Sequence, residues 1–490
     1  MKVYKNKLYY GDCLKVIDDM ELCSVDLIYL DPPFNSNRAY NTIYKDSTGR
    51  PLPSQINAFC DMWELTPERE ELLRNIHILA KNRGVDSKTI EFWKHWMNAL
   101  RYTNSKLLAY LLYMMERLLV MKGLLKPTGS IYLHCDPTAS HYIKVLMDSI
   151  FGHQNFRNEI VWCYSNSGRS KKKFTSKHDI ILLYAKSEKY YWDYTIPISQ
   201  KYLNSHYRQK DENGNRCRIR IDGGKKRIYY PVKGMTCNDW WADIPSLNSV
   251  AKERLGYPTQ KPIALLKRII EASCPEDGII LDPFCGCGTT ICAAHELNRR
   301  WLGIDIAYHA IRRVVQNRLQ DRYKLIEGQN YEIDGIPNTL EGARDIWKRD
   351  KYQFQRWVIE YIDGFVTNKS TGDGGVDGRL FFSNPNEKDL QTMILEVKGG
   401  QHINISVVRN LRGAMEREKL PMAGLIVLED LPDRKKQNFL TEMASAGTLE
   451  IHGKHYPRMQ LLTTKEILEG KKFDTPSIAR LSTGQSLLKL

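Results

Sequence analysis

The sequence predicts an α/β protein of more than one domain, and three observations lead to this prediction. The chain has 490 residues, which is too long for one ordinary domain. Short apolar runs such as Val25–Leu30 and Gly278–Leu281 are followed by turn residues and helical patterns, as is typical of buried parallel strands. All 11 cysteines lie between Cys13 and Cys292, and this shift in composition indicates a separate C-terminal domain.

Composition excludes several classes of protein. Hydrophobic residues make up 42% of the chain and charged residues 26%, and no apolar run approaches the roughly eighteen residues of a membrane span. The N-terminal sequence lacks the apolar stretch of a secretory signal, so we expect a cytoplasmic protein without membrane contact. The cysteine spacings are irregular and include no Cys-x-x-Cys pair, which favours reduced thiols over disulfides or structural zinc.

The positive charge is concentrated in one segment. The net charge is +15, and residues 157–233 alone hold 18 Lys and Arg against 7 Asp and Glu. A solvated basic loop would explain the charge but not the aromatic side chains placed among the cations, which suit base stacking beside phosphate neutralisation. We therefore expect a nucleic acid partner. These aromatic residues are Tyr190, Tyr191, Trp192, Tyr194, Tyr202, Tyr207, Tyr229 and Tyr230.

The first candidate site follows the apolar run Val25–Leu30. A buried parallel strand here delivers the Asp31 carboxylate to the carboxyl edge of the sheet, where open α/β sheets bind ligands. Pro32 and Pro33 stiffen the loop and leave backbone acceptors, and Phe34 adds a ring. Two acceptors beside a ring suit the exocyclic amine of a nucleobase flipped out of its duplex. Taken alone, the same residues are also a common stiff turn.

A second strand ends in a glycine loop. Asp282 follows Gly278–Leu281, and the loop that includes Phe284 leads through Thr289 into a helical pattern. Gly286 and Gly288 would let the backbone approach a nucleoside cofactor closely. About 19 residues after Gly286 another strand ends at Asp305, where an acid can hold ribose hydroxyls. The loop has no phosphate-binding Lys, which argues against a nucleoside triphosphate.

These motifs together resemble the DNA amino-methyltransferases of the β arrangement, in which the catalytic motif precedes the cofactor motif. The resemblance covers roughly residues 1–325 and includes the segments 126–134 and 176–184, which look like the central strand and the wall of the target-base pocket. It implies S-adenosylmethionine as cofactor and double-stranded DNA as substrate. Asp12 would contact the cofactor adenine, and Thr259 and Lys261 would lie near its methionine end.

The resemblance also implies a domain plan and a target base. Residues 1–156 form a catalytic half, 157–255 a target-recognition region and 256–330 a cofactor-binding half of a Rossmann-like, circularly permuted methyltransferase. Asp as the first residue of the catalytic motif favours adenine N6, and cytosine N4 is the alternative. The segment 35–104 is longer than the motif needs, and its Trp63, Trp93 and Trp96 favour helix core over DNA contact.

A second set of charged residues follows in 331–474. Residues 340–361 predict one helix, after which a glycine-rich turn places Asp377 at the start of a strand. Glu396 and Lys398 are two apart on a further strand and therefore share a face. If the strands pair, Asp377 and Glu396 can share Mg²⁺ while Lys398 assists an attacking water. Each feature alone is common on ordinary surfaces.

The combination resembles the PD-(D/E)xK nucleases, particularly the Mrr-like catalytic domain, with Glu360 as an auxiliary acid. The two resemblances imply a fused restriction and modification protein. Two alternatives stay open, namely a modification enzyme whose C-terminal domain only binds DNA, and a DNA-binding regulator with a vestigial cofactor fold. Residues 475–490 read as a loose tail, and a homodimer is compatible with the sequence.

Overall fold

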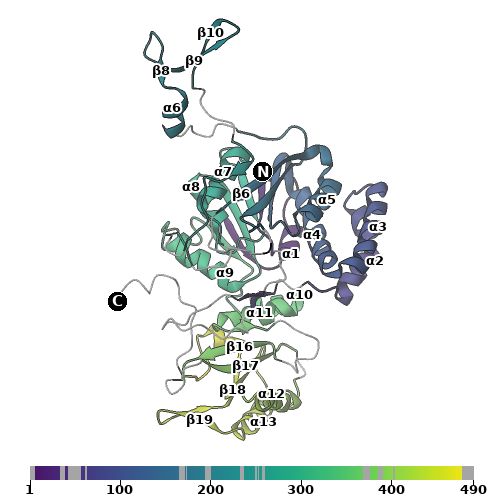
Figure 1. Ribbon diagram of the computed structural model, residues 1–490. Helices are drawn as coiled ribbons and strands as arrows, with labels where there is room; N and C mark the ends of the chain where they lie inside the picture. Colours follow the sequence, from purple (N-terminus) through teal and green to yellow (C-terminus); the bar gives the residue numbers. More distant parts are fainter. Residues whose placement is uncertain are drawn as a thin grey trace.

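The computed structural model consists of two α/β units and an arm that stands apart from the first unit (Figure 1). It describes residues 6–33, 39–41, 57–60, 63–164, 172, 174–193, 200–231, 237–248, 251, 253–255, 260–367, 376–384, 390–400 and 403–476. Two predicted site residues, Phe34 and Thr259, lie outside these ranges, as does most of the predicted tail. Within them, no helix is long and apolar enough to cross a membrane.

The first unit is built on a nine-stranded sheet in the order β11-β6-β7-β5-β2-β12-β13-β1-β14. Strand β2 pairs in parallel with β12, although about 250 residues separate them in sequence. This confirms the α/β prediction and brings the two predicted motifs to one edge. The strands are β1 (Lys7–Tyr10), β2 (Val25–Leu30), β5 (Leu125–Cys135), β6 (Phe156–Cys163), β7 (His178–Ala185), β11 (Trp240–Trp241), β12 (Ile279–Asp282), β13 (Arg300–Asp305) and β14 (Glu332–Asp334).

Alternate residues of the strands face two layers of helices. Leu27 and Tyr29 of β2 pack in the core that includes α7, whereas Ile28 and Leu30 pack in the core that includes α4. Such alternation is what a strand buried on both faces requires. The helical segments are α1 (Cys13–Asp18), α2 (Pro67–Asn82), α3 (Ser87–Thr103), α4 (Ser105–Leu124), α5 (Ser140–Phe151), η1 (His153–Asn155), α7 (Ile263–Ser273), α8 (Thr289–Glu296), α9 (Tyr308–Arg313) and η2 (Val314–Gln320).

The segment after the catalytic motif is largely helical, as expected. Trp93 of α3 is fully buried and donates its Nε1–H to Ser149 Oγ at 2.8 Å, and Trp63, just before α2, is buried against Tyr110. The core interpretation is confirmed for these two residues. Trp96 is only partly buried and stacks on Phe92. A short pair of strands, β3 (Ala39–Asn41) and β4 (Asn57–Cys60), precedes α2.

The region 157–255 does not form one separate domain. Strands β6 and β7, which we assigned to that region, pair within the main sheet because their apolar residues complete its core. Among the described residues of this region, only 200–231 stand apart, at the top of Figure 1, and we call them the arm. The arm consists of α6 (Gln200–His206), β8 (Gln209–Lys210), β9 (Arg216–Asp222) and β10 (Lys225–Tyr229), with strand order β10-β9-β8.

The second unit has a five-stranded sheet in the order β15-β16-β17-β18-β21. The pairs among β15, β16 and β17 are antiparallel, and those among β17, β18 and β21 are parallel. The elements are α10 (Leu340–Arg349), α11 (Lys351–Tyr361), β15 (Phe365–Val366), β16 (Gly378–Phe382), β17 (Gln391–Lys398), α12 (Ser406–Arg417), β18 (Met422–Val427), α13 (Asp433–Ala444), β19 (Thr448–Ile451), β20 (Lys454–Pro457), β21 (Met459–Thr463) and α14 (Thr464–Leu468).

The prediction of one helix over 340–361 is wrong. Asp350 has φ −154° and ψ 102°, so α10 ends before it and α11 begins after it. The Asp350 carboxylate accepts hydrogen bonds from the backbone N–H groups of Tyr352 and Gln353 and thereby caps α11. The apolar spacing did not reveal this break, because a capping Asp is also an ordinary exposed residue in a helix.

Candidate functional site

Asp31 lies directly after β2, at the carboxyl edge of the main sheet. Lys261, which precedes α7, places its Nζ 2.8 Å from both carboxylate oxygens of Asp31. The side chains are 19% and 8% exposed, so this ion pair is shielded from solvent on most sides. Pro32 is buried and Pro33 half-buried beside it. The Asp31 carboxylate therefore accepts hydrogen bonds from the Lys261 ammonium group, as it could from the amine of a substrate.

A chain of buried polar groups lies behind this ion pair. The Tyr29 hydroxyl lies 2.9 Å from His134 Nδ1, and His134 Nε2 lies 3.0 Å from Asp179. Tyr164 donates its hydroxyl to the other oxygen of Asp179 at 2.9 Å. Burial lowers the pKa of His134, and the charge of Lys261 lowers it further. The lowered pKa favours the neutral imidazole, so His134 itself adds no positive charge at pH 7.

Asp179 carries the negative charge of this chain. Burial opposes its ionisation, but hydrogen bonds from His134 and Tyr164 outweigh burial and hold the pKa of Asp179 below its usual value. The sequence placed Asp179 only within the segment 176–184, so its contact with His134 was not predicted. Both residues are polar and lie within apolar strands, β5 and β7, which is the signal that could have identified them.

The glycine loop between β12 and α8 has a backbone conformation that favours glycine. Gly286 and Gly288 have φ values of +50° and +75°, and a side chain at Gly288 would lie 2.9 Å from Val314. The Asp305 carboxylate accepts hydrogen bonds from the N–H groups of Gly286 and Ala307, both at 2.8 Å. The predicted spacing of about 19 residues therefore brings Asp305 to the loop itself.

Two acids at this edge are buried deeply enough to resist ionisation. Burial raises the pKa of Asp282 to about 7, and the charges of Asp31 and Asp305 add to the effect. Burial also raises the pKa of Asp305 to about 6. Loss of water disfavours the ionised form of a buried carboxyl group. A ligand that donates a hydrogen bond to the carboxylate would offset this cost. Phe284, between the two acids in sequence, is partly buried with its ring 6.4 Å from that of Tyr113.

The back of the loop is fixed by Arg318, a residue that the sequence did not single out. Arg318 is fully buried and donates Nε to the Cys287 carbonyl at 2.6 Å. Its guanidinium also lies 3.5 Å from the Thr289 hydroxyl, so Thr289 is turned toward the interior. Cys285 and Cys287 are free and buried, and the described residues contain no group of three or more His, Cys, Asp or Glu arranged to hold a metal ion.

Asp12 lies at the next strand end. It caps α1 and accepts two hydrogen bonds from Arg117, at 3.0 and 2.8 Å. The backbone N–H of Gly11 donates to the Asp305 carbonyl, so the Asp12 and Asp305 loops are joined. Arg117 is buried and lies 3.5 Å from the centroid of the Tyr113 ring. An arginine within the apolar run of α4 is the signal that could have revealed this contact.

The second cluster has its predicted members together. Gly378 pairs with Leu395 across β16 and β17, which places Asp377 beside Glu396. Asp377 accepts a hydrogen bond from the Val397 N–H at 2.8 Å, and Lys398 Nζ lies 2.8 Å from Glu396. Burial raises the pKa of Glu396; Lys398 lowers it and Asp377 raises it further. Glu360 does not join them, because it contacts α9 of the first unit at 2.6 Å.

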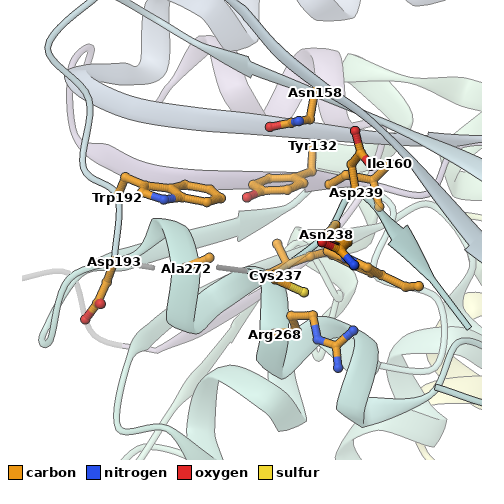
Figure 2. Close-up of a pocket in the computed structure, with 12 residues that line it drawn as sticks. Tyr132, Asn158, Ile160, Trp192, Asp193, Cys237, Asn238, Asp239, Arg268 and Ala272 are labelled. Atoms are coloured by element: carbon orange, nitrogen blue, oxygen red, sulfur yellow. The ribbon is translucent and has the colours of Figure 1, made fainter. Parts of the chain in front are cut away.

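A hollow of about 480 Å³ lies elsewhere on the first unit (Figure 2). It is bounded by β5, β6, β11 and the later turns of α7, with Tyr132 and Trp192 beside one another in the view. Tyr132 places its hydroxyl 2.6 Å from Ser273 Oγ. Trp192, one of the aromatic residues suited to base stacking, lines this hollow, but none of the predicted catalytic or cofactor residues does. The strand ends therefore carry the candidate chemistry.

Comparisons with known proteins identify the family of the first unit. The family model described as DNA methylase matches residues 25–316. The type II methyltransferase M.EcaI of Enterobacter cloacae is 28% identical over 257 residues, covering 42% of this chain and 57% of that protein. M.ScaI of Streptomyces caespitosus is 34% identical over 304 residues, covering 61% of this chain and 76% of that protein.

Among solved structures, the PvuII DNA methyltransferase, described as cytosine-N4-specific, matches 65% of this chain and 89% of its own, at 13% identity and a TM-score of 0.40. The family match spans β2 with Asp31, the glycine loop and β13 with Asp305, and it ends before α10. It covers more than half of the chain and contains most of the first sheet. The chain therefore belongs to the DNA methylase family.

Proposed function

We propose that the first unit transfers a methyl group from S-adenosylmethionine to the N6 amine of adenine in double-stranded DNA, in the cytoplasm. The meeting of Asp31 with the glycine loop at the ends of β2 and β12 carries this proposal, because it brings an amine acceptor to a nucleoside-type site. Asp31, Pro32, Pro33 and Phe34 would hold the target base. Cytosine N4 is the second candidate, since its amine has the same donors.

The residues around the glycine loop fit the cofactor. Asp12 and Asp305 offer carboxylate oxygens for the amine and hydroxyls of a nucleoside, and Gly286 and Gly288 would let the backbone approach it closely. Phe284 lies in the loop, Asp282 and Thr289 lie at its two ends, and Lys261 contacts Asp31. Thr259 would contact the methionine end of the cofactor. The bound cofactor supplies an electrophilic methyl group on a sulfonium.

The chain's own groups then act on the amine. Asp31 accepts one N–H of the target amine, and the Pro32 carbonyl accepts the other, which turns the nitrogen lone pair out of conjugation. Lys261 donates to both Asp31 oxygens and thereby orients the carboxylate. Formation of the N–C bond would be accompanied by cleavage of the sulfonium S–C bond, with S-adenosylhomocysteine as the leaving group. The methylated nitrogen would then carry an extra proton, which Asp31 is placed to receive.

Nucleoside analysis tests this assignment. Purified protein is incubated with S-adenosylmethionine and unmethylated DNA, and the DNA is digested to nucleosides for mass spectrometry. We expect N6-methyladenine from the wild type and none from Asp31→Ala. N4-methylcytosine would replace the proposed base with the second candidate. Binding of DNA by the wild type without any methylation would instead support a regulator with a vestigial site. Long-read sequencing of DNA from expressing cells gives the sequence context.

We propose that the second unit cleaves DNA with Mg²⁺ and that the two units form a restriction and modification pair. The nearness of Asp377, Glu396 and Lys398 supports this proposal. Carboxylate oxygens are the ligands that Mg²⁺ prefers, so Asp377 and Glu396 fit the ion, which would polarise a phosphodiester and activate water. Lys398 would assist that water. A domain that binds DNA without cutting is the second candidate.

Plasmid cleavage separates the two candidates for the second unit. Unmethylated plasmid is incubated with protein and Mg²⁺, with EDTA as one control and premethylated plasmid as another. Cleavage by the wild type that disappears in Asp377→Ala is the expected result. If the wild type shifts the plasmid in a gel but leaves it intact at every Mg²⁺ concentration, the binding-only domain is the better assignment.

A further inference from the structure

Helix α11 of the second unit lies against the two acidic loops of the first unit. Figure 1 shows α11 directly below α9, at the junction of the units. The junction is not a thin polar contact, because Phe354, Trp357 and Val358 of α11 belong to the same continuous core as Tyr10 and Ile311 of the first unit. Burial on this scale makes α11 a structural part of both units.

Glu360 of α11 contacts the loop that follows Asp305. Its Oε2 accepts the N–H of Tyr308 at 2.6 Å and that of His309 at 3.4 Å. These are the first amides of α9, whose own capping residue is Ala307, which has no side-chain acceptor. The second unit therefore supplies the cap that the sequence of α9 lacks.

Gln353 of α11 contacts the loop that leads to Asp12. Its Nε2 donates to the Tyr10 carbonyl at 3.1 Å, and a side chain at Gly11 would lie 3.1 Å from the same nitrogen. Nearby, Lys15 of α1 pairs with Asp350 at 2.6 Å. One helix thus fixes both loops, and these loops are already joined by the Gly11 to Asp305 hydrogen bond.

We propose that α11 completes the cofactor site of the methyltransferase, with Glu360 and Gln353 as positioning residues that orient Asp305 and Asp12. This inference rests on the proposed cofactor site. Neither residue touches the site of the chemistry, and each acts through a loop backbone. The family match ends at residue 316, so the chain draws part of its cofactor site from outside the matched segment.

Cofactor affinity tests the proposal, with S-adenosylhomocysteine as the probe in calorimetry on the full chain. Glu360→Ala should raise the Kd about tenfold and Gln353→Ala about threefold. Glu360→Gln keeps an amide oxygen for the Tyr308 N–H and should raise the Kd less than Glu360→Ala. The melting temperature of each variant without ligand identifies any that fail to fold, and in that case Glu360→Gln carries the test.

Two control variants distinguish a specific effect on the cofactor loops from a general weakening of the contact between the two units. Asp363→Asn removes another ion pair between the units, with Arg312 at 2.9 Å, but does not contact the first amides of α9. Gln355→Ala removes an amide two residues from Gln353 on the same helix. Both should leave the Kd within about twofold of the wild type. If Asp363→Asn weakens binding as much as Glu360→Ala, the positioning role is wrong.

The pH dependence of S-adenosylhomocysteine binding provides a further test, because weaker packing between the units would not shift it. Burial raises the pKa of Asp305 to about 6, with Glu360 raising it and Arg356 lowering it. Tyr10, Tyr113, Asp282 and Cys285 also face Asp305. Binding by an ionised Asp305 should weaken as pH falls through about 6. In Glu360→Gln this weakening should move to lower pH, and an unmoved profile would overturn the proposal.

The outcomes distinguish this inference from the proposed function. If the wild type does not bind S-adenosylhomocysteine, the proposed cofactor is wrong and the inference fails with it. If the wild type binds and Glu360→Ala binds equally well, only the inference fails. Hydrogen exchange offers a reciprocal measurement, because ligand that is held through α11 should slow exchange in α11 and at the Phe365–Val366 strand.

Discussion

Asp31 and Asp282 stand at the ends of two parallel strands whose sequences lie about 250 residues apart, whereas Asp377 and Glu396 stand 19 residues apart on an antiparallel pair. Each site pairs one carboxylate with a lysine. In the first site the lysine comes from a third segment, before α7, and in the second it is two residues away on the same strand. The charged residues of the first site thus come together only when distant segments fold against one another. Those of the second site come from a single pair of strands.

The largest expected effect is the loss of methylation in Asp31→Ala. Removing the acceptor that orients the target amine and receives its proton should lower kcat for methyl transfer about a thousandfold. Plasmid cleavage should stay within about twofold of the wild type, because the two sites share no residues. Transfer of labelled methyl groups and gel analysis of plasmid measure the two activities side by side.

A matched control keeps this result specific. Asp243→Ala removes an exposed acid that pairs with Arg268 away from the strand ends, and both activities should be unchanged. A thousandfold loss in Asp243→Ala would assign the effect to the general charge of the unit and not to Asp31.

The opposite pattern is expected for Asp377→Ala. The variant should lose cleavage by at least about a hundredfold, because one of the two metal-holding carboxylates is gone, while kcat for methylation stays within about twofold. Glu418→Ala, an acid that pairs with Arg379 on the same unit, is the control and should cleave normally. If Asp377→Ala loses methylation at an unchanged melting temperature, the two sites do not act independently.

A smaller effect shared by both activities is expected from the arm. Lys225, Lys226 and Arg227 lie on β10, which is exposed throughout. Replacing all three by Gln should raise the KM for DNA about tenfold and reduce the dependence of binding on salt concentration, because fewer phosphate counterions are released. Fluorescence anisotropy at several salt concentrations measures both quantities. If only methylation depends on these residues, the arm serves the first unit alone.

The smallest effect concerns stability. Burial raises the pKa of Asp282 to about 7, so its folded state binds a proton more tightly than its unfolded state does. Ionised Asp282 therefore destabilises the fold above pH 7, and this cost disappears as pH falls toward 4. Asp282→Asn should raise the Tm of the ligand-free protein by about 2–4 °C at pH 8 and by less at pH 5. Equal shifts at both pH values would contradict the raised pKa.

The two sites also differ in how much of each the sequence could predict. The strand ends at Asp31, Asp282 and Asp305 follow from apolar runs and glycine spacing, because these patterns are local. The resemblance implied only that Lys261 lies near the methionine end of the cofactor, and its contact with Asp31 was not predicted, since it depends on how distant segments meet. For Glu396 and Lys398, the two-residue spacing predicts the shared face, but not the 2.8 Å ion pair between them.

Other features could not be predicted because they depend on packing between distant elements. Arg117 and Arg318 fix the Asp12 and glycine loops from the interior, yet each looks like an isolated charge in an apolar pattern. Glu360 was interpreted as part of the second site because its helix precedes that site in sequence. Its contact with α9 depends on how the two units pack, and local sequence patterns do not predict such packing.

The position of β1 in the sheet has a consequence for synthesis. Within the part of the chain that the structure describes, β1 pairs only with β13 and β14, and β14 ends at Asp334. At about 5–20 residues per second, the ribosome needs tens of seconds to provide those partners, during which β1 stays without them. Asp12, Asp305 and α11 are all synthesised before Glu396. We expect that a nascent chain can form its proposed cofactor site before its second acidic site.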